Sequence, residues 1–261
     1  MNTVLKIAIP VGLGIAVIAA WQWAVTALAI SPIVLPGPDA IARAFVSDFA
    51  NLSAALWTTL RITIVAFVLA VVGGVALAVL FSQSRIIETA LFPYAVILQV
   101  TPVVAIAPIV TIWVGYDNIN AVLLILAWIV AFFPILANTT LGLRSADHNL
   151  IDLFRLYGAS RWQILWKLRF PSALPYLLSA MKVSGGLALI GVVVAEFAAG
   201  TGTATGLAWL ITLATRNLHM ATAFAALVLL SILGIVIFFV LSALEWALLH
   251  RWHESAIARE R

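Results

Sequence analysis

Cysteine is absent from the 261-residue sequence, and charged side chains make up only 9% of it. Without cysteine the chain forms no disulfide, has no thiol nucleophile and has no Cys-ligated metal site. A soluble domain carries charge on about a quarter of its residues, so this scarcity excludes an ordinary water-soluble fold. Hydrophobic residues make up 64% of the chain, and its mean hydropathy is +1.16. These values are typical of an integral membrane protein.

Other kinds of site are also poorly supported. His250 and His253 are three residues apart and have no third ligand nearby, so we predict no metal site. No Ser/His/Asp set or pair of acids suggests a membrane-embedded enzyme, and no Walker-type lysine loop suggests P-loop binding of ATP. The net charge of +4 is explained by positively charged cytoplasmic loops, so we predict no binding of nucleic acid.

Long apolar runs predict an all-α, polytopic fold, because a membrane-spanning helix needs about 20 apolar residues. The first run is too long for the apolar core of a signal peptide, so we expect an uncleaved helix. Pro93, Pro102 and Pro108 lie in the third run and predict a kinked or partly unwound span. We expect one transmembrane domain over residues 1–261, with six spans at about 7–30, 59–82, 91–114, 119–141, 177–199 and 221–249.

The distribution of Lys and Arg predicts that both termini face the cytoplasm. With that orientation only Arg43, Arg61 and Arg216 lie outside, and Lys182 in the fifth span is left uncounted. The cytoplasmic side then holds Lys6, Arg85, Arg144, Arg155, Arg161, Lys167, Arg169, Arg251, Arg259 and Arg261.

Two extracytoplasmic segments have helical patterns of their own. In residues 31–58 the apolar side chains recur at helical spacing and predict a short helix on the membrane surface; they are Ile41, Phe45, Phe49 and Leu52. The glycines of 200–206 predict a flexible turn that leads into an interfacial or re-entrant helix over 207–213. No strand precedes these glycines, so a phosphate-binding loop is not supported.

The cytoplasmic segment 142–176 is predicted to fold as two short helices. Residues 147–157 have apolar side chains on one face and form the first helix. Gly158 follows where a left-handed residue ends a helix. Ser160 and Gln163 have the spacing of a capping box, which starts a second helix that runs to about Arg169. We expect Pro171 and Pro175 to end that helix and to restart the chain as the fifth span.

This pattern alone leaves two interpretations open, an amphipathic hairpin on lipid headgroups or an elbow that is presented to a partner. The detailed sequence favours the second. Gly158 and Pro171 are thirteen residues apart, and Leu168 and Phe170 precede the proline. In this the segment resembles the signature loop of bacterial ABC-importer permeases, the binding-protein-dependent transport inner-membrane component family. The pattern of that loop is Glu-Ala-Ala, three residues, Gly, nine residues and Ile-x-Leu-Pro.

The resemblance covers about residues 31–200 and is strongest to the nitrate/sulfonate/taurine-type subgroup, which includes thiamine-pyrimidine-precursor and riboflavin importers. It implies a permease subunit in the bacterial inner (cytoplasmic) membrane that forms the path for a small solute delivered by an extracytoplasmic binding protein. It also implies a cytoplasmic ATPase subunit that uses ATP and a second permease copy, whether identical or homologous, and no cofactor bound by this chain. The substrate stays open; the subgroup suggests a planar or anionic small molecule.

The family's coupling helix sits in a cleft of the ATPase. By resemblance the contacts in this chain are Asp152, Leu153, Phe154, Arg155, Gly158, Ala159, Ser160, Arg161 and Pro171. At the first three positions Asp-Leu-Phe replaces Glu-Ala-Ala, which suggests a roomier or more apolar pocket in a matched ATPase. The alternative function is a self-sufficient secondary transporter or channel. The absence of an inverted repeat and the scarcity of ionisable residues in the spans argue against it.

Polar residues in the spans are candidates for the translocation path. They are Gln99, Thr101, Asn138, Ser184 and Glu196. An acid inside a membrane is costly unless it faces a cavity or a partner. Glu196 therefore either lines the path or forms a structural tie with Arg61 or Arg216, and we favour the tie.

Overall fold

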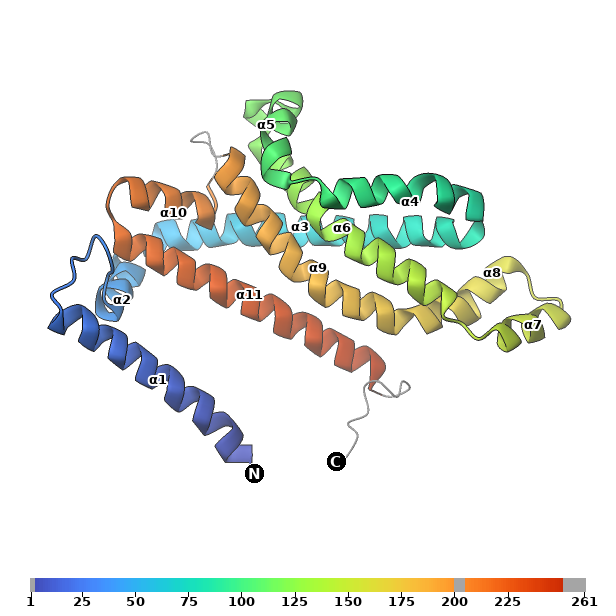
Figure 1. Cartoon of the computed structure of the whole chain (residues 1–261), viewed down its shortest axis with the longest axis horizontal. Helices are drawn as coiled ribbons and strands as arrows, with labels where there is room; N and C mark the ends of the chain where they lie inside the picture. Colours follow the sequence, from blue (N-terminus) through green and yellow to red (C-terminus); the bar gives the residue numbers. More distant parts are fainter. Residues whose placement is uncertain (1–2, 200–204, 251–261) are drawn as a thin grey trace. The chain divides into compact units, whose positions relative to one another are not determined.

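The protein is described by a computed structural model over residues 3–199 and 205–250. In these ranges every regular element is a helix (Figure 1), which confirms the predicted all-α fold. The expected turn at Gly200–Gly202 and the residues Arg251, His253, Arg259 and Arg261 lie outside the described residues. The helices are α1 (Thr3–Ala27), α2 (Pro38–Ser47), α3 (Phe49–Gln83), α4 (Arg85–Val100), α5 (Val103–Val114), η1 (Tyr116–Asn118), α6 (Ile119–Arg144), α7 (His148–Leu156), α8 (Arg161–Ile164), η2 (Leu165–Arg169), α9 (Phe170–Ala199), α10 (Leu207–Arg216) and α11 (Met220–Leu249).

The chain divides into two compact units. Among the described residues the first comprises 3–58 and 205–231, and the second comprises 59–199 and 232–250. The chain passes from one unit to the other inside α3 and inside α11. Among the described residues, five helices are long and apolar enough to cross a membrane. The number is six if the bent pair α4 and α5 counts as one span, as the sequence predicted.

The first unit is built around α2, the start of α3, α10 and the start of α11. Its core contains Ile41, Leu52 and Leu207, each buried. The helix expected on the membrane surface is shorter than predicted, because the chain bends at Asp48, where φ is −107° and ψ is 18°. Phe49 and Leu52 therefore belong to α3, which begins about ten residues before the predicted span.

The second unit is organised by α6 and α9, which lie side by side and run in opposite directions. Glycine allows their backbones to touch: a Cβ on Gly142 would lie 2.9 Å from the Cα of Ala173, and one on Gly191 would lie 2.8 Å from the Cα of Ala127. Small residues are the usual contacts of helices in membranes, because they allow close packing. Leu123, Leu126, Ile135 and Leu136 on α6 are fully buried in this unit.

The third predicted span is broken, as its prolines indicated. Between α4 and α5 the chain turns by 102°, and Thr101 and Pro102 at the break have extended backbone. Pro93 and Pro108 stay inside the two helices. The break thus falls at Pro102. The ring of this proline clashes with a helical conformation of the preceding residue, Thr101, which is extended instead.

One boundary was predicted wrongly: Pro171 and Pro175 do not interrupt the helix. α8, η2 and α9 follow one another without a gap, and η2 is a π-helical turn in which the N–H of Phe170 donates to the carbonyl of Leu165. Such a turn rearranges the backbone hydrogen bonds just before a proline that has no N–H to donate. The hydroxyl of Ser172 also donates to the carbonyl of Leu168 at 2.9 Å. A single long helical segment therefore connects the elbow to the membrane.

Candidate functional site

The segment between α6 and α9 folds as the predicted elbow, and local sequence signals shape it. The side chain of Asp147 caps α7 by accepting from the backbone N–H of Asn149 at 2.8 Å. At the other end Gly158 has φ +72°. The N–H of Ala159 donates to the carbonyl of Phe154, and the N–H of Gly158 donates to that of Arg155, each at 2.9 Å. These are the two bonds of a Schellman helix ending, which needs a left-handed residue at the glycine position.

The second arm of the elbow begins with the predicted capping box. The N–H of Ser160 donates to Gln163 Oε1 at 2.7 Å, and the N–H of Gln163 donates to Ser160 Oγ at 3.3 Å. Ile151 and Ile164 pack against each other at the base of the elbow together with Ala146. Capping at both helix ends and a small apolar core together make the elbow a defined structure.

The tip of the elbow is apolar and exposed. The exposed fractions are 45% for Leu153, 84% for Leu156 and 85% for Tyr157. A groove of about 400 Å³ beside the tip is lined by Leu153, Phe154, Tyr157, Gly158, Ala159, Gln163 and Lys167. Exposed apolar side chains around a rimmed groove mark a surface for a partner.

The structure brings most of the predicted coupling residues together at this tip. Asp152 and Arg155 form an exposed ion pair on α7, with Asp152 Oδ1 3.2 Å from Arg155 Nη1. Phe154 is half-buried against the core of the elbow. The remaining predicted residues lie on the turn and on α8, except Pro171. Pro171 lies in the first turn of α9 and so belongs to the base of the elbow.

Glu196 is fully buried on α9. The hydroxyl of Thr59 on α3 donates to its carboxylate at 2.9 Å, and Thr59 is buried as well. Arg61 is exposed and makes no ion pair within the described residues. Arg216 lies with its guanidinium 5.9 Å from the ring centre of Trp209. The structure thus gives Glu196 a polar neighbour that the sequence did not indicate.

The other candidates for the path lie on separate elements. Gln99 is exposed near the end of α4, and Thr101 lies at the break and donates to the carbonyl of Ile97. Asn138 on α6 donates to the carbonyl of Pro134 at 2.9 Å, and Ser184 on α9 is fully buried. No hydrogen bond between described residues connects any two of these four side chains.

Sequence reasoning missed an ion pair between the predicted spans. Lys182 on α9 lies with its Nζ 2.5 Å from Glu245 Oε2 on α11, and about a quarter of each side chain is exposed. A second ion pair connects Glu88 on α4 with Arg144 on α6. Both pairs connect residues that are more than 50 positions apart in the sequence. The sequence could not show which faces of two helices meet.

Comparison with known proteins identifies relatives that match most of the chain. The family described as "Binding-protein-dependent transport system inner membrane component" matches residues 70–246. The riboflavin transport system permease protein RibX of Chloroflexus aurantiacus is 33% identical, with 90% of this chain and 86% of RibX covered. The formylaminopyrimidine transport permease protein ThiX of Halalkalibacterium halodurans is 32% identical, over 87% and 90% of the two chains.

A solved structure has the same fold. It is an inward-facing conformation of the MetNI methionine ABC transporter, which matches with a TM-score of 0.62 at 22% identity and covers 78% of this chain and 98% of that one.

Proposed function

The chain belongs to the binding-protein-dependent transport system inner membrane component family, and we propose that its α7–α8 elbow is the part through which a separate ATPase drives it. The chain is the transmembrane permease subunit of an ABC importer. In this proposal the ATPase binds and hydrolyses ATP, and this chain binds no cofactor. The permease itself performs mechanical work only.

The observation that carries the proposal is the rigid, exposed tip of the elbow. Gly158 at φ +72° and the capping box at Ser160 fix the turn between the two short helices, and the side chains they present to solvent include the apolar Leu153, Leu156 and Tyr157. Such a surface gains free energy by burial in a partner. We assign the ATPase contacts to the tip residues Asp152, Leu153, Phe154, Arg155, Gly158, Ala159, Ser160 and Arg161, and we assign Pro171 to the base.

The continuous helix gives a route for the movement. α8, η2 and α9 form one helical segment, so a displacement of the tip acts directly on α9. α9 packs on α6 through glycine contacts at both ends, and close-packed helices transmit displacement because they have little room to deform. Closure of two ATPases would therefore move α9 and α6 together and switch the path between its inward-open and outward-open states.

The translocation path is assigned to the polar residues near the α4–α5 break and on the α6–α9 pair. Gln99 and Thr101 lie where the backbone leaves the helix, which membranes tolerate only beside protein or a watery cavity. Asn138 and Ser184 are the corresponding candidates on α6 and α9. We assign Glu196 a structural role, because its carboxylate is fully buried and accepts from Thr59.

The complete importer in this proposal contains two copies of the permease, two ATPases and an extracytoplasmic binding protein, and it lies in the bacterial inner membrane. Residues 1–261 act as one transport domain with both termini in the cytoplasm. RibX and ThiX are named for riboflavin and formylaminopyrimidine transport, so we propose a small planar or anionic solute as the cargo.

Co-purification and uptake test the coupling role together. The tagged permease should retain an ABC ATPase through purification, and its ATP hydrolysis should depend on the permease. Gly158→Asp should reduce uptake about tenfold or more, because the added carboxylate would lie within the proposed ATPase contact and φ +72° is less favourable for a residue with a side chain than for glycine. Gly12→Ala, at a position with no neighbour within 4 Å of an added Cβ, serves as control. A permease that retains no ATPase and transports normally with Gly158→Asp would contradict the proposal.

A further inference from the structure

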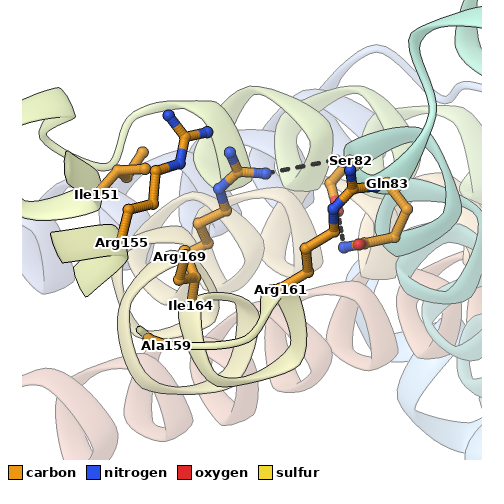
Figure 2. A pocket seen from close by; sticks show the side chains of 8 residues that line it. All are labelled: Ser82, Gln83, Ile151, Arg155, Ala159, Arg161, Ile164 and Arg169. Carbon is orange, nitrogen blue, oxygen red and sulfur yellow. Dashed lines mark hydrogen bonds between the residues drawn. The ribbon is translucent and has the colours of Figure 1, made fainter. Parts of the chain in front are cut away.

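A basic hollow lies beside the elbow and adjoins the groove at its tip, with which it shares Ala159. Figure 2 shows three arginines lining it, Arg155 from α7, Arg161 from α8 and Arg169 from η2. Ser82 and Gln83, the last residues of α3, form the opposite wall. The hollow has a volume of about 490 Å³, which lies within the range of small-molecule sites in proteins.

The charges of this hollow are not balanced by the protein. Asp152 pairs with Arg155 at 3.2 Å and offsets one of the three positive charges. Within the described residues no carboxylate lines the hollow, and the guanidinium of Arg161 makes no hydrogen bond or ion pair. Arg155 also lies close enough to Arg169 to repel it. Like charges brought together in this way raise the energy of the fold unless an anion joins them.

Arg169 is held in place at the wall of the hollow. Its Nη1 donates to the carbonyl of Ser82 at 3.3 Å and so holds the side chain against the end of α3. Its Nε is buried and has no acceptor among the described residues. A buried donor without a partner costs free energy, and a guanidinium held on one side keeps its remaining N–H groups in a planar fork that matches phosphate oxygens.

The position of the hollow agrees with a ligand at the membrane boundary. It lies where the charged elbow meets the last turn of α3 and the beginning of α9, at the ends of two apolar spans. Trp162 and Trp166 on the same helical segment are 61% and 55% exposed. Exposed tryptophans are enriched at the level of lipid headgroups, and anionic headgroups attract clusters of basic residues.

We propose that the hollow formed by Arg155, Arg161 and Arg169 against Ser82 and Gln83 binds a phosphate group. The group comes either from an anionic lipid of the adjacent leaflet or from phosphate in solution. Binding neutralises the three guanidinium groups and clamps the elbow to the end of α3. Arg155 and Arg161 are also among the proposed ATPase contacts, so a phosphate bound here adjusts how freely the elbow moves next to the surface that meets the ATPase.

The test uses the purified full-length chain without an ATPase. In lipid nanodiscs of phosphatidylcholine with and without phosphatidylglycerol, native mass spectrometry counts the retained anionic lipid. In detergent, inorganic phosphate is titrated against chloride at equal ionic strength, and the melting temperature is followed. We expect wild-type protein to retain phosphatidylglycerol or to gain melting temperature with phosphate. Arg155→Gln with Arg161→Gln should weaken this binding about tenfold or more.

Arg85→Gln is the matched control, because Arg85 is an exposed arginine at the start of α4 that does not line the hollow. Arg161→Gln alone removes no hydrogen bond between described residues. It is measured in the same way if the double variant does not fold. Retention of phosphatidylglycerol without an effect of phosphate on the melting temperature identifies a lipid headgroup as the ligand. An effect of phosphate without lipid retention identifies free phosphate as the ligand. The proposal is wrong if neither probe binds, if Arg85→Gln loses binding equally, or if the arginine variants bind both probes as tightly as the wild-type protein.

Discussion

At the scale of single residues, the shape of the elbow depends on the backbone of Gly158 and on the side chain of Ser160. Gly158 is needed because its φ of +72° is the left-handed region, which costs a residue with a side chain about 1–2 kcal/mol. Ser160 is needed because its hydroxyl accepts the N–H of Gln163 while the side chain of Gln163 accepts that of Ser160. Both effects act over a few residues, so the sequence showed them directly.

Ser160→Ala tests the capping box. The substitution removes the hydroxyl acceptor of Gln163 N–H at the start of α8, and we expect it to destabilise the elbow by about 1 kcal/mol. Hydrogen exchange of the 161–164 amides should become faster, with little change in the melting of the whole chain. Ser53→Ala is the control, because the hydroxyl of Ser53 only donates to the carbonyl of Ala50 within α3. Unchanged exchange in Ser160→Ala would show that the cap is unimportant.

Thr59→Val tests the structural role of Glu196. Valine keeps the volume of threonine but cannot donate to the buried carboxylate, so we expect a loss of about 1–3 kcal/mol and a lower melting temperature with normal initial uptake. Thr63→Val is matched in helix and burial, and its hydroxyl donates only to the carbonyl of Thr59, so it should be nearly neutral. Normal melting with abolished uptake in Thr59→Val would place Glu196 in the path instead.

At the scale of helices, contact between α6 and α9 depends on glycines that are far apart in sequence from the residues they touch. Gly142 meets Ala173, and Gly191 meets Ala127, so the two backbones approach at both ends of the pair. The helix is continuous from Arg161 through η2 into α9. In the proposed mechanism, a displacement of the elbow therefore moves this pair of helices. Loss of the close contact would weaken both the stability of the second unit and the coupling.

Gly191→Ala tests this packing. The new Cβ would lie 2.8 Å from the Cα of Ala127, and the backbone of α6 cannot move aside without disturbing the whole pair. We expect a destabilisation of about 1–3 kcal/mol from overpacking, seen as a lower melting temperature. Gly186→Ala is the control on the same helix, since nothing lies within 4 Å of its added Cβ. It should leave the melting temperature unchanged or raise it through helix propensity. Equal effects of the two substitutions would refute the packing argument.

At the scale of the whole molecule, the proposed importer is an assembly, and we propose that its specificity for an ATPase lies at the tip of α7. Leu153 is half exposed beside the groove, whereas Phe154 contributes to the apolar core of the elbow. The two large side chains that replace the family's alanines therefore have different tasks. In this proposal the exposed Leu153 contacts the ATPase, and Phe154 packs beneath that surface.

Leu153→Ala tests partner choice. Removal of an exposed leucine should leave the melting temperature of the permease unchanged but weaken retention of its ATPase about tenfold, as truncation of a central interface residue does. Leu213→Ala, with 44% exposure in the first unit, is the control and should retain the ATPase normally. Phe154→Ala should lower stability as well as retention. Full retention by Leu153→Ala would remove Leu153 from the interface.

The sequence by itself determined the all-α membrane fold, the broken third span and the two-helix elbow. Hydropathy, proline, a left-handed glycine and a helix cap act within one helix or one turn, so a linear reading detects them. Only the tertiary structure decided that Thr59 donates a hydrogen bond to Glu196, 137 positions away, and that Lys182 forms an ion pair with Glu245. It also decided that the chain stays helical through Pro171, and that three arginines share one hollow with the end of α3. These features depend on which helix faces meet and on how one π-helical turn rearranges its hydrogen bonds. Neither can be predicted from the residue pattern of a single helix.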